Sequence, residues 1–250
     1  MNLARVFPFR RKVDRPRLRL LCLPYAGGGA SLYRQWSPAL EPAVEVCPVE
    51  LPGRGVRGDE SLVPDMTSLC DGLAAAVEEL ADGVPMALFG HSMGARIAFE
   101  LARRFEGQVV HLFASASAAP GAPWKHAAGG DVRPTIQLTD DEFRQRLRAL
   151  GGTPLAILDD DDLMARVMPI VRADFVLIEG YRAAPRSCVG CPVTAFAGVD
   201  DPRASPSDAA AWELSTTAAF RLVELDAGHF FVDSHRSDLL REIRRDLAVL

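Results

Sequence analysis

The sequence predicts an α/β fold with a mostly parallel central sheet. Along the 250 residues, runs rich in apolar and β-branched residues alternate with helix-length segments, and Gly or Pro bounds most of the runs. This alternation is typical of strand–helix–strand units, in which ligand chemistry gathers at the carboxyl ends of the strands. The length and a hydrophobic content of 48% favour one domain, spanning residues 1–250, with a large core.

The pattern predicts six strands and five helices around the sheet. The expected strands are Leu18–Leu23, Val44–Glu50, Met86–Gly90, Val109–Ala114, Val193–Gly198 and Phe220–Leu225. The expected helices are Ala30–Leu40, Met66–Ala81, Met93–Phe105, Ser207–Thr217 and Arg236–Leu250. Within Met66–Ala81 the apolar residues recur at helical spacing, which indicates an amphipathic helix with one buried face.

One interval, from about residue 131 to 182, shows no strand signal. It contains two expected helices, Asp140–Leu150 and Asp160–Gly180, separated by a Gly-Gly-Thr-Pro turn. Because this interval is far longer than an ordinary connection between strands, we expect it to form a helical lid over the site. The apolar residues expected on the inner faces of the lid, where they would bind substrate, are Phe143, Leu147, Leu163, Val167 and Val171.

Charge and hydropathy exclude several classes of protein. A net charge of −5 disfavours a nucleic-acid binder, since binding to phosphates requires a clustered excess of Lys and Arg. The basic run between Arg10 and Arg19 is interpreted as a solvated arm that leads into the first strand. No stretch has the apolar length of a membrane helix, and the first residues lack the apolar core of a signal peptide. We therefore expect a cytoplasmic protein that does not bind membranes.

The cysteine and glycine patterns predict neither a disulfide framework nor a cofactor site. The five cysteines are an odd number, and the Cys188–Cys191 pair lacks further ligands for a zinc ion. The glycines of Gly53–Gly58 match a dinucleotide fingerprint, but no helix is expected after them. No metal and no cofactor are therefore expected.

The segment Gly90–Gly94 matches the G-x-S-x-G pattern of a serine nucleophile. It follows an expected strand and begins an expected helix, as a nucleophile elbow requires. Ser92 would have to adopt a strained backbone conformation there, and side chains at positions 90 and 94 would collide with the neighbouring strand and helix. Ser92 is therefore the candidate nucleophile.

A serine hydroxyl requires a histidine base and an acid that orients the histidine. His229 is the candidate base, because it follows the last expected strand in a loop of small residues. Phe230 and Phe231 come directly after it and would exclude water. The other four histidines are assigned to structural or surface positions: His91, His111, His126 and His235.

The acid is expected in the loop after the penultimate strand. Asp200 and Asp201 compete there, and Asp201 is preferred because Pro202 restrains it, whereas Asp200 would cap or solvate the turn. The chain order Ser92, Asp201, His229 is that of α/β hydrolases. The sequence therefore predicts an α/β-hydrolase fold, with helices flanking the sheet and a helical lid.

Acyl transfer also requires N–H donors for the developing oxyanion. The residue after the nucleophile, Met93, supplies one donor. The second is expected in the glycine-rich loop Pro24–Gly29, at the carboxyl end of an early strand, and Ala26 is its candidate.

Six short segments, which occur in consistent order between about residues 18 and 232, resemble segments of one enzyme family. They are LPYAGG (Leu23–Gly28), LPGR (Leu51–Arg54), FGHSMGA (Phe89–Ala95), LGGTP (Leu150–Pro154), RADF (Arg172–Phe175) and GHFF (Gly228–Phe231). The family is the type II thioesterases, standalone hydrolases that serve polyketide synthases and nonribosomal peptide synthetases. The chain differs from the family at Val199, where an acidic residue is frequent.

The resemblance implies hydrolysis of acyl thioesters on the phosphopantetheine arm of an acyl or peptidyl carrier protein, which removes stalled or wrong acyl groups. It assigns the acid to Asp201, the last residue of Gly-x-x-Asp, and the oxyanion donors to Ala26 and Met93. We expect a monomer. Basic residues on the lid are candidates for contacting an acidic carrier protein; they are Arg144, Arg148, Arg166 and Arg172.

Two other interpretations remain open. A generic carboxylesterase or a chain-terminating fatty-acid thioesterase would use the same three residues, and lid and pocket shape would distinguish them. A catalytically silent docking scaffold would require an incomplete set of these residues, whereas the sequence contains the full set.

Overall fold

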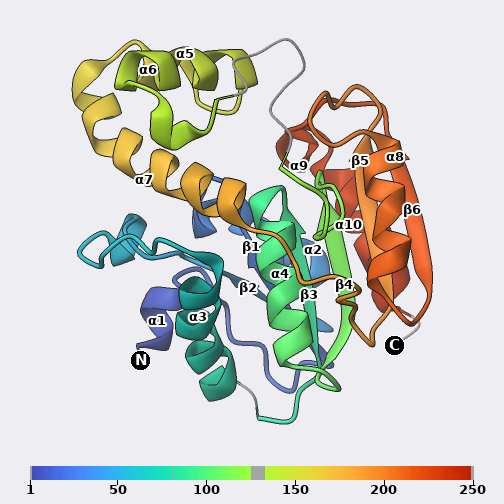
Figure 1. Cartoon of the computed structure of the whole chain (residues 1–250). Helices are drawn as coiled ribbons and strands as arrows, with labels where there is room; N and C mark the ends of the chain where they lie inside the picture. Colours follow the sequence, from blue (N-terminus) through green and yellow to red (C-terminus); the bar gives the residue numbers. More distant parts are fainter. Residues whose placement is uncertain (1, 81, 125–132, 249–250) are drawn as a thin grey trace.

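A computed structural model describes residues 2–80, 82–124 and 133–248. Its centre is a six-stranded sheet in the order β2-β1-β3-β4-β5-β6, in which all neighbouring strands are parallel (Figure 1). The strands are β1 (Leu18–Leu23), β2 (Val44–Pro48), β3 (Met86–His91), β4 (Val109–Ser115), β5 (Val193–Gly198) and β6 (Phe220–Leu225). The expected mostly parallel sheet is confirmed, with strand ends close to those predicted.

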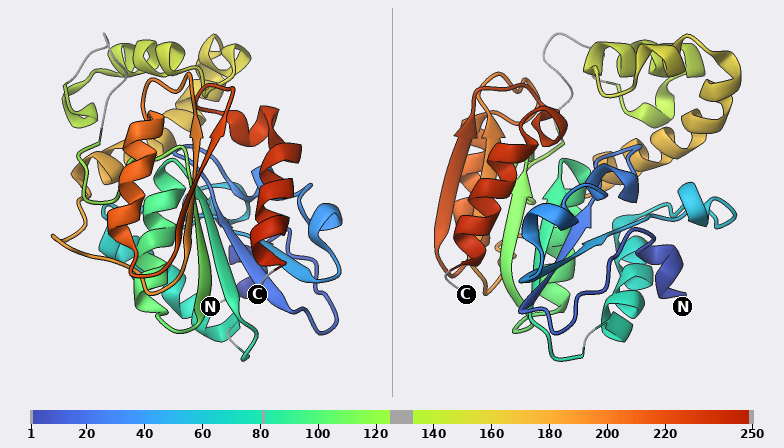
Figure 2. Two further views of the ribbon diagram at one scale, coloured as in Figure 1. Left: turned by 90° about the vertical axis from the view of Figure 1, so that its right-hand side faces the viewer. Right: turned by 180° about the vertical axis from the view of Figure 1, so that it is seen from behind.

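Helices cover both faces of the sheet (Figure 2). One face carries α1 (Leu3–Val6), α3 (Met66–Leu80), α4 (Met93–Arg104) and α8 (Pro206–Ala210), and the other carries α2 (Ser37–Leu40), α9 (Phe231–Ser234) and α10 (Arg236–Leu247). Two segments that were expected to be α-helical are partly 3₁₀ helix instead, at Ala30–Tyr33 and Ala211–Ser215. The expected helix ends at residues 81 and 250 lie outside the described residues.

The hydrophobic core has one layer on each side of the sheet. Since side chains alternate along a strand, β1 contributes Leu21 and Leu23 to the layer beneath α3 and α4. Leu20 and Cys22 point to the opposite layer, where they meet Trp36 and the buried face of α10. A strand that is buried on both faces is mostly apolar, and in β1 the one charged residue is Arg19.

A helical insertion between β4 and β5 stands beyond the carboxyl ends of the strands (Figures 1 and 2). It contains α5 (Asp140–Leu150), α6 (Leu155–Leu158) and α7 (Asp161–Gly180), which runs back to the sheet. The insertion has its own apolar cluster, against which Ala26 of the core packs. Residues 131 and 132 of the expected lid lie outside the described residues. No helix in the described ranges is long and apolar enough to cross a membrane.

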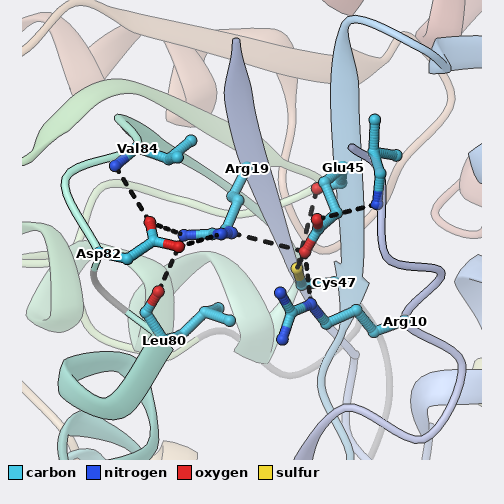
Figure 3. A network of polar contacts seen from close by, with 8 residues as sticks. Arg10, Arg19, Glu45, Cys47, Leu80, Asp82 and Val84 are labelled. Atoms are coloured by element: carbon cyan, nitrogen blue, oxygen red, sulfur yellow. Dashed lines mark hydrogen bonds and ion pairs between the residues drawn. The ribbon is translucent and has the colours of Figure 1, made fainter. Parts of the chain in front are cut away.

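The N-terminal basic run is not a solvated arm throughout, which corrects the sequence-based interpretation. Arg10 and Arg19 both contact Glu45, which is buried in β2, and Arg19 also forms a bidentate pair with Asp82 at 2.6 and 2.8 Å (Figure 3). Burial alone would raise the pKa of Glu45, but hydrogen bonds from Arg10 and the Val13 N–H hold it below its usual range. These contacts join β1, β2 and the start of β3 at the amino ends of the strands.

This network predicts that Glu45→Gln destabilises the protein by about 2–4 kcal/mol, because the change leaves the Arg19 guanidinium buried with one fewer anionic partner. Urea denaturation followed by circular dichroism measures the effect. Glu41→Gln is the matched control, since Glu41 is exposed. Equal unfolding midpoints for the two variants would contradict the prediction.

Candidate functional site

Ser92 lies at the sharp turn between β3 and α4. Its backbone has φ 55° and ψ −113°, a strained conformation for a residue with a side chain, and its N–H donates to the Ser115 carbonyl at 2.7 Å. A Cβ at Gly90 would lie 2.1 Å from the Gly94 carbonyl oxygen, and a Cβ at Gly94 would lie 2.2 Å from the Leu23 carbonyl oxygen. The turn therefore requires glycine at both positions, and it presents the Ser92 side chain at the carboxyl end of the sheet.

The structure brings the three residues expected to react within hydrogen-bond distance. The Ser92 hydroxyl donates to His229 Nε2 at 3.1 Å, and His229 Nδ1–H donates to Asp201 Oδ2 at 2.7 Å. The other carboxylate oxygen of Asp201 accepts the backbone N–H groups of Arg203 and Ala204 at 2.8 and 3.2 Å, which fixes its orientation. All three side chains are buried.

The neighbouring Asp200 is exposed. Its backbone N–H donates to the Ala227 carbonyl, so it takes part in the turn through its main chain. Of the two competing aspartates, Asp201 therefore has the position and the contacts of an acid that orients His229.

His91 supports the His229 loop from behind. Its Nε2–H donates to the His229 carbonyl oxygen at 2.9 Å, so its Nδ1 is left to accept the Ser115 hydroxyl at 2.9 Å. Burial lowers the pKa of His91 well below its usual range, which keeps the ring neutral in this arrangement. Its side chain therefore has structural partners, as expected.

The remaining histidines lie away from the reacting groups. His111 packs inside the sheet, where its Nε2 lies 2.9 Å from Thr194 Oγ1 and its ring stacks on Phe113. His235 pairs with the adjacent Ser234 hydroxyl. His126 lies outside the described residues.

The environment of His229 favours its neutral form. Burial lowers its pKa, and the nearby Arg203 cation lowers it further, while the hydrogen bond to Asp201 partly opposes both effects. Phe230 meets the imidazole edge-on at 4.9 Å between ring centroids and lines the same cavity. Phe231 instead lies in the core beside His91, so only Phe230 contributes to excluding water.

The two residues expected to form an oxyanion hole lie at the ends of β1 and β3, close to Ser92. Met93 is the first residue of α4, so its N–H has no acceptor within the helix. Ala26 follows β1 in the turn closed by the Gly28 N–H and the Tyr25 carbonyl, and it lines the cavity together with Ser92 and His229. These positions are those that an oxyanion hole requires.

A buried ion pair holds the Ala26 loop to the insertion. Arg54 forms two hydrogen bonds with Asp174 of α7, at 2.6 and 2.7 Å, and donates a third to the Gly28 carbonyl at 3.0 Å. Asp174 also accepts the Gly27 N–H at 2.7 Å. Both side chains are more than nine-tenths buried. The sequence placed Arg54 and Asp174 in two family motifs without assigning them a role, and the structure shows that they meet at this loop.

The insertion closes the cavity next to Ser92. Leu147 and Val171 line it, as expected, together with Leu150, Phe175 and Arg203. The cavity is about 30 Å³, which is room for little more than a water molecule.

The other three expected lining residues do not border this cavity. Phe143 is buried inside the apolar cluster of the insertion, and Val167 packs against that cluster. Leu163 is 41% exposed, which corrects the expectation that it faces inward. It falls in the first turn of α7, where the side chain projects to solvent.

Three of the four arginines suggested for carrier binding have partners within the insertion. Arg144 pairs with Asp161 at 2.7 Å, and Arg148 pairs with Asp159 at 2.6 Å. Arg172 contacts Asp140 and the carbonyls of residues 135 and 138. Arg166 is exposed on α7, and no ion pair holds it within the described ranges.

Sequence reasoning missed three residues beside the reacting groups. Arg203 lines the cavity next to Ser92, and a second small cavity behind His229 is lined by Arg96, Trp124 and Arg203. In the sequence, the position of Arg203 two residues after Asp201 was the one sign that a cation lies near the site. That spacing alone does not predict a role.

Comparison with known proteins identifies the family. A model of the thioesterase domain matches residues 18–247. The chain belongs to the thioesterase domain family. It is 36% identical to the gramicidin S biosynthesis protein GrsT of Aneurinibacillus migulanus, over 94% of this chain and 90% of that protein. It is also 28% identical to the human medium-chain S-acyl fatty acid synthase thioesterase, over 86% of this chain and 80% of that protein.

Solved structures of thioesterases share this fold. The type II thioesterase BorB from the borrelidin biosynthetic cluster superposes with a TM-score of 0.81 at 36% identity, with 94% of each chain covered. The predicted α/β-hydrolase fold and the resemblance to type II thioesterases are thereby confirmed.

The ion pair at the Ala26 loop predicts that Asp174→Asn lowers kcat for thioester hydrolysis at least about tenfold, because Arg54 and the Gly27 N–H lose the charge that fixes the loop. Steady-state kinetics with a short acyl thioester, measured well below the unfolding temperature, tests this. Asp140→Asn is the matched control, since Asp140 is an exposed carboxylate that also pairs with an arginine of α7. A lower unfolding temperature with unchanged kcat would show that the pair acts on stability alone.

Proposed function

We propose that this protein is an editing thioesterase that hydrolyses stalled or wrong acyl groups from the phosphopantetheine arms of carrier proteins. The hydrogen-bonded series Ser92, His229, Asp201 at the carboxyl end of the sheet carries the proposal. The type II thioesterase BorB and the biosynthesis protein GrsT, each 36% identical to this chain, support carrier-bound acyl groups as the substrates.

In the proposed reaction, Ser92 Oγ attacks the thioester carbonyl while His229 Nε2 accepts its proton. The Met93 and Ala26 N–H groups stabilise the negative oxygen of the tetrahedral intermediate. His229 then gives its proton to the departing pantetheine sulfur, which leaves as a thiol. In the second half, His229 takes a proton from water as the water attacks the acyl-serine carbonyl. His229 then returns this proton to Ser92 Oγ as the acyl–oxygen bond breaks, which releases the acid and restores the free serine.

The helical insertion is proposed to be a lid that controls access to Ser92. It forms one side of the narrow cavity beside Ser92 through Leu147 and Val171, and it would move aside when an acyl chain enters. Residues that line the cavity from the lid would then set which acyl chains are accepted. The exposed Arg166 on α7 remains a candidate for contacting an acidic carrier protein.

The family also contains a second candidate activity. The similarity to the human fatty acid synthase thioesterase favours a chain-terminating role on fatty-acyl carriers as the alternative. Medium-chain fatty-acyl groups would then be the preferred substrates.

We expect the wild-type protein to remove short acyl groups from acylated carrier proteins, as seen in their mass spectra before and after incubation, and Ser92→Ala to remove none. The change deletes the nucleophile and little else. A fluorophosphonate probe should label the wild type at Ser92 and leave Ser92→Ala unlabelled. Turnover retained by Ser92→Ala would overturn the proposal, and a preference for medium-length fatty-acyl chains would favour the fatty-acid alternative.

Asp201→Asn and Asp200→Asn form a matched pair for the same assay. Asp201→Asn should lose far more activity, because only Asp201 bonds to His229. The reverse order would move the acid to Asp200.

The lowered pKa of His229 predicts the pH dependence of kcat/KM. His229 must be neutral to accept a proton, so activity is present above its pKa and is lost as the pH falls through it. Since this pKa lies below the ordinary value of 6.5, kcat/KM should reach half its plateau below pH 6.5. A short thioester and overlapping buffers give this profile. Half-maximal activity above pH 6.5 would contradict the assigned environment of His229.

A further inference from the structure

Two arginines are buried beside the reacting groups, and the proposed mechanism uses neither. Arg203 is 8% exposed and Arg96 is 1% exposed. Their guanidinium carbons lie 5.4 and 5.7 Å from the ring centre of Trp124, so both cations face the same indole. Arg203 borders both cavities, the one next to Ser92 and the one behind His229.

The positive charge of Arg203 is not neutralised by the protein around it. Asp201 is the carboxylate that acts on it electrostatically. Both oxygens of Asp201 are already engaged, one by His229 and the other by the backbone N–H groups of residues 203 and 204. In the ranges that the structure describes, the Arg203 guanidinium has no ion pair and its ring partner is Trp124.

Arg96 adds a second cation with spare donors. Its Nη2 donates to the Ala122 carbonyl at 3.0 Å, but its Nε and Nη1 are buried without hydrogen-bond partners. Burial lowers the pKa of each arginine to about 10, so both remain charged at neutral pH. Burying cations without anions is costly, and an anionic ligand in this place would recover that cost.

We propose that Arg203, supported by Arg96, forms an anion subsite that selects acyl groups ending in a carboxylate. The subsite borders the cavity that contains Ser92, where the thioester carbonyl must lie. Groups only a few bonds from that carbonyl belong to the acyl chain, whereas the phosphate of the pantetheine arm lies at the far end of a long spacer. Short dicarboxylic acyl thioesters, such as succinyl or malonyl, therefore fit this charge.

This inference deepens the proposed function and rests on it, so its test separates the two. Succinyl- and butyryl-N-acetylcysteamine are matched in length and differ in the end group. We expect the wild type to prefer the succinyl thioester, and Arg203→Met to lower the ratio of kcat/KM for succinyl over butyryl about tenfold to hundredfold. Arg203→Lys should retain part of the preference, and Arg241→Met on the exposed side of α10 should retain all of it.

The ratio is informative because a merely structural role for Arg203 would lower both rates equally. An equal fall, or an unchanged ratio, overturns the subsite. If the wild type hydrolyses neither thioester, the proposed function fails instead.

A binding measurement tests the subsite without relying on turnover. By titration calorimetry, the Ser92→Ala protein should bind succinyl-N-acetylcysteamine at least tenfold more tightly than butyryl-N-acetylcysteamine, and Ser92→Ala/Arg203→Met should lose this difference. Equal affinities for the two thioesters in Ser92→Ala would overturn the subsite. Thermal unfolding of each variant establishes that it is folded before the comparison is made.

Discussion

The close approach of helix α4 to strands β1 and β3 is the constraint on which the rest of the site depends. The helix begins directly against the Leu23 carbonyl, which is possible only because position 94 has no side chain. This approach forces the strained backbone of Ser92 and places the N–H of Met93 at the end of the sheet. The loops after β1, β5 and β6 reach the same point because parallel strands end together there. The geometry of the reacting groups is thus a consequence of sheet topology and two glycines.

Buried charges serve different purposes at the two ends of the sheet. At the amino ends, Arg19, Glu45 and Asp82 form a closed network that joins neighbouring strands. At the carboxyl ends, the Arg54–Asp174 pair fixes a loop that carries a backbone donor, and Arg203 presents a charge to a cavity. Ionic groups that have partners stabilise one conformation, whereas we propose that the Arg203 cation is retained to bind an anionic group.

The sequence predicted the sheet, and it singled out the three side chains that the structure joins by hydrogen bonds at the candidate site, because both depend on local signals. Strands appear as apolar runs, and Ser92 and His229 each lie in a loop directly beside such a run. The Arg54–Asp174 pair joins residues 120 positions apart, and no local pattern specifies that contact. The same limit explains the error at Arg19, because a run of charges does not reveal which members alternate into a sheet. For Leu163 the helix was predicted, but its rotation against the core was not.

The placement of Trp124 gives the protein an optical probe of its own cavity. The chain has three tryptophans, and Trp36 and Trp212 are fully enclosed in the two core layers, away from solvent. Of the three, Trp124 alone is partly exposed, and it lies beside two cations at the edge of the cavity behind His229. Its emission depends on the local field and hydration, while the other two contribute a constant background. Changes in intrinsic fluorescence therefore report the state of that cavity without any added label.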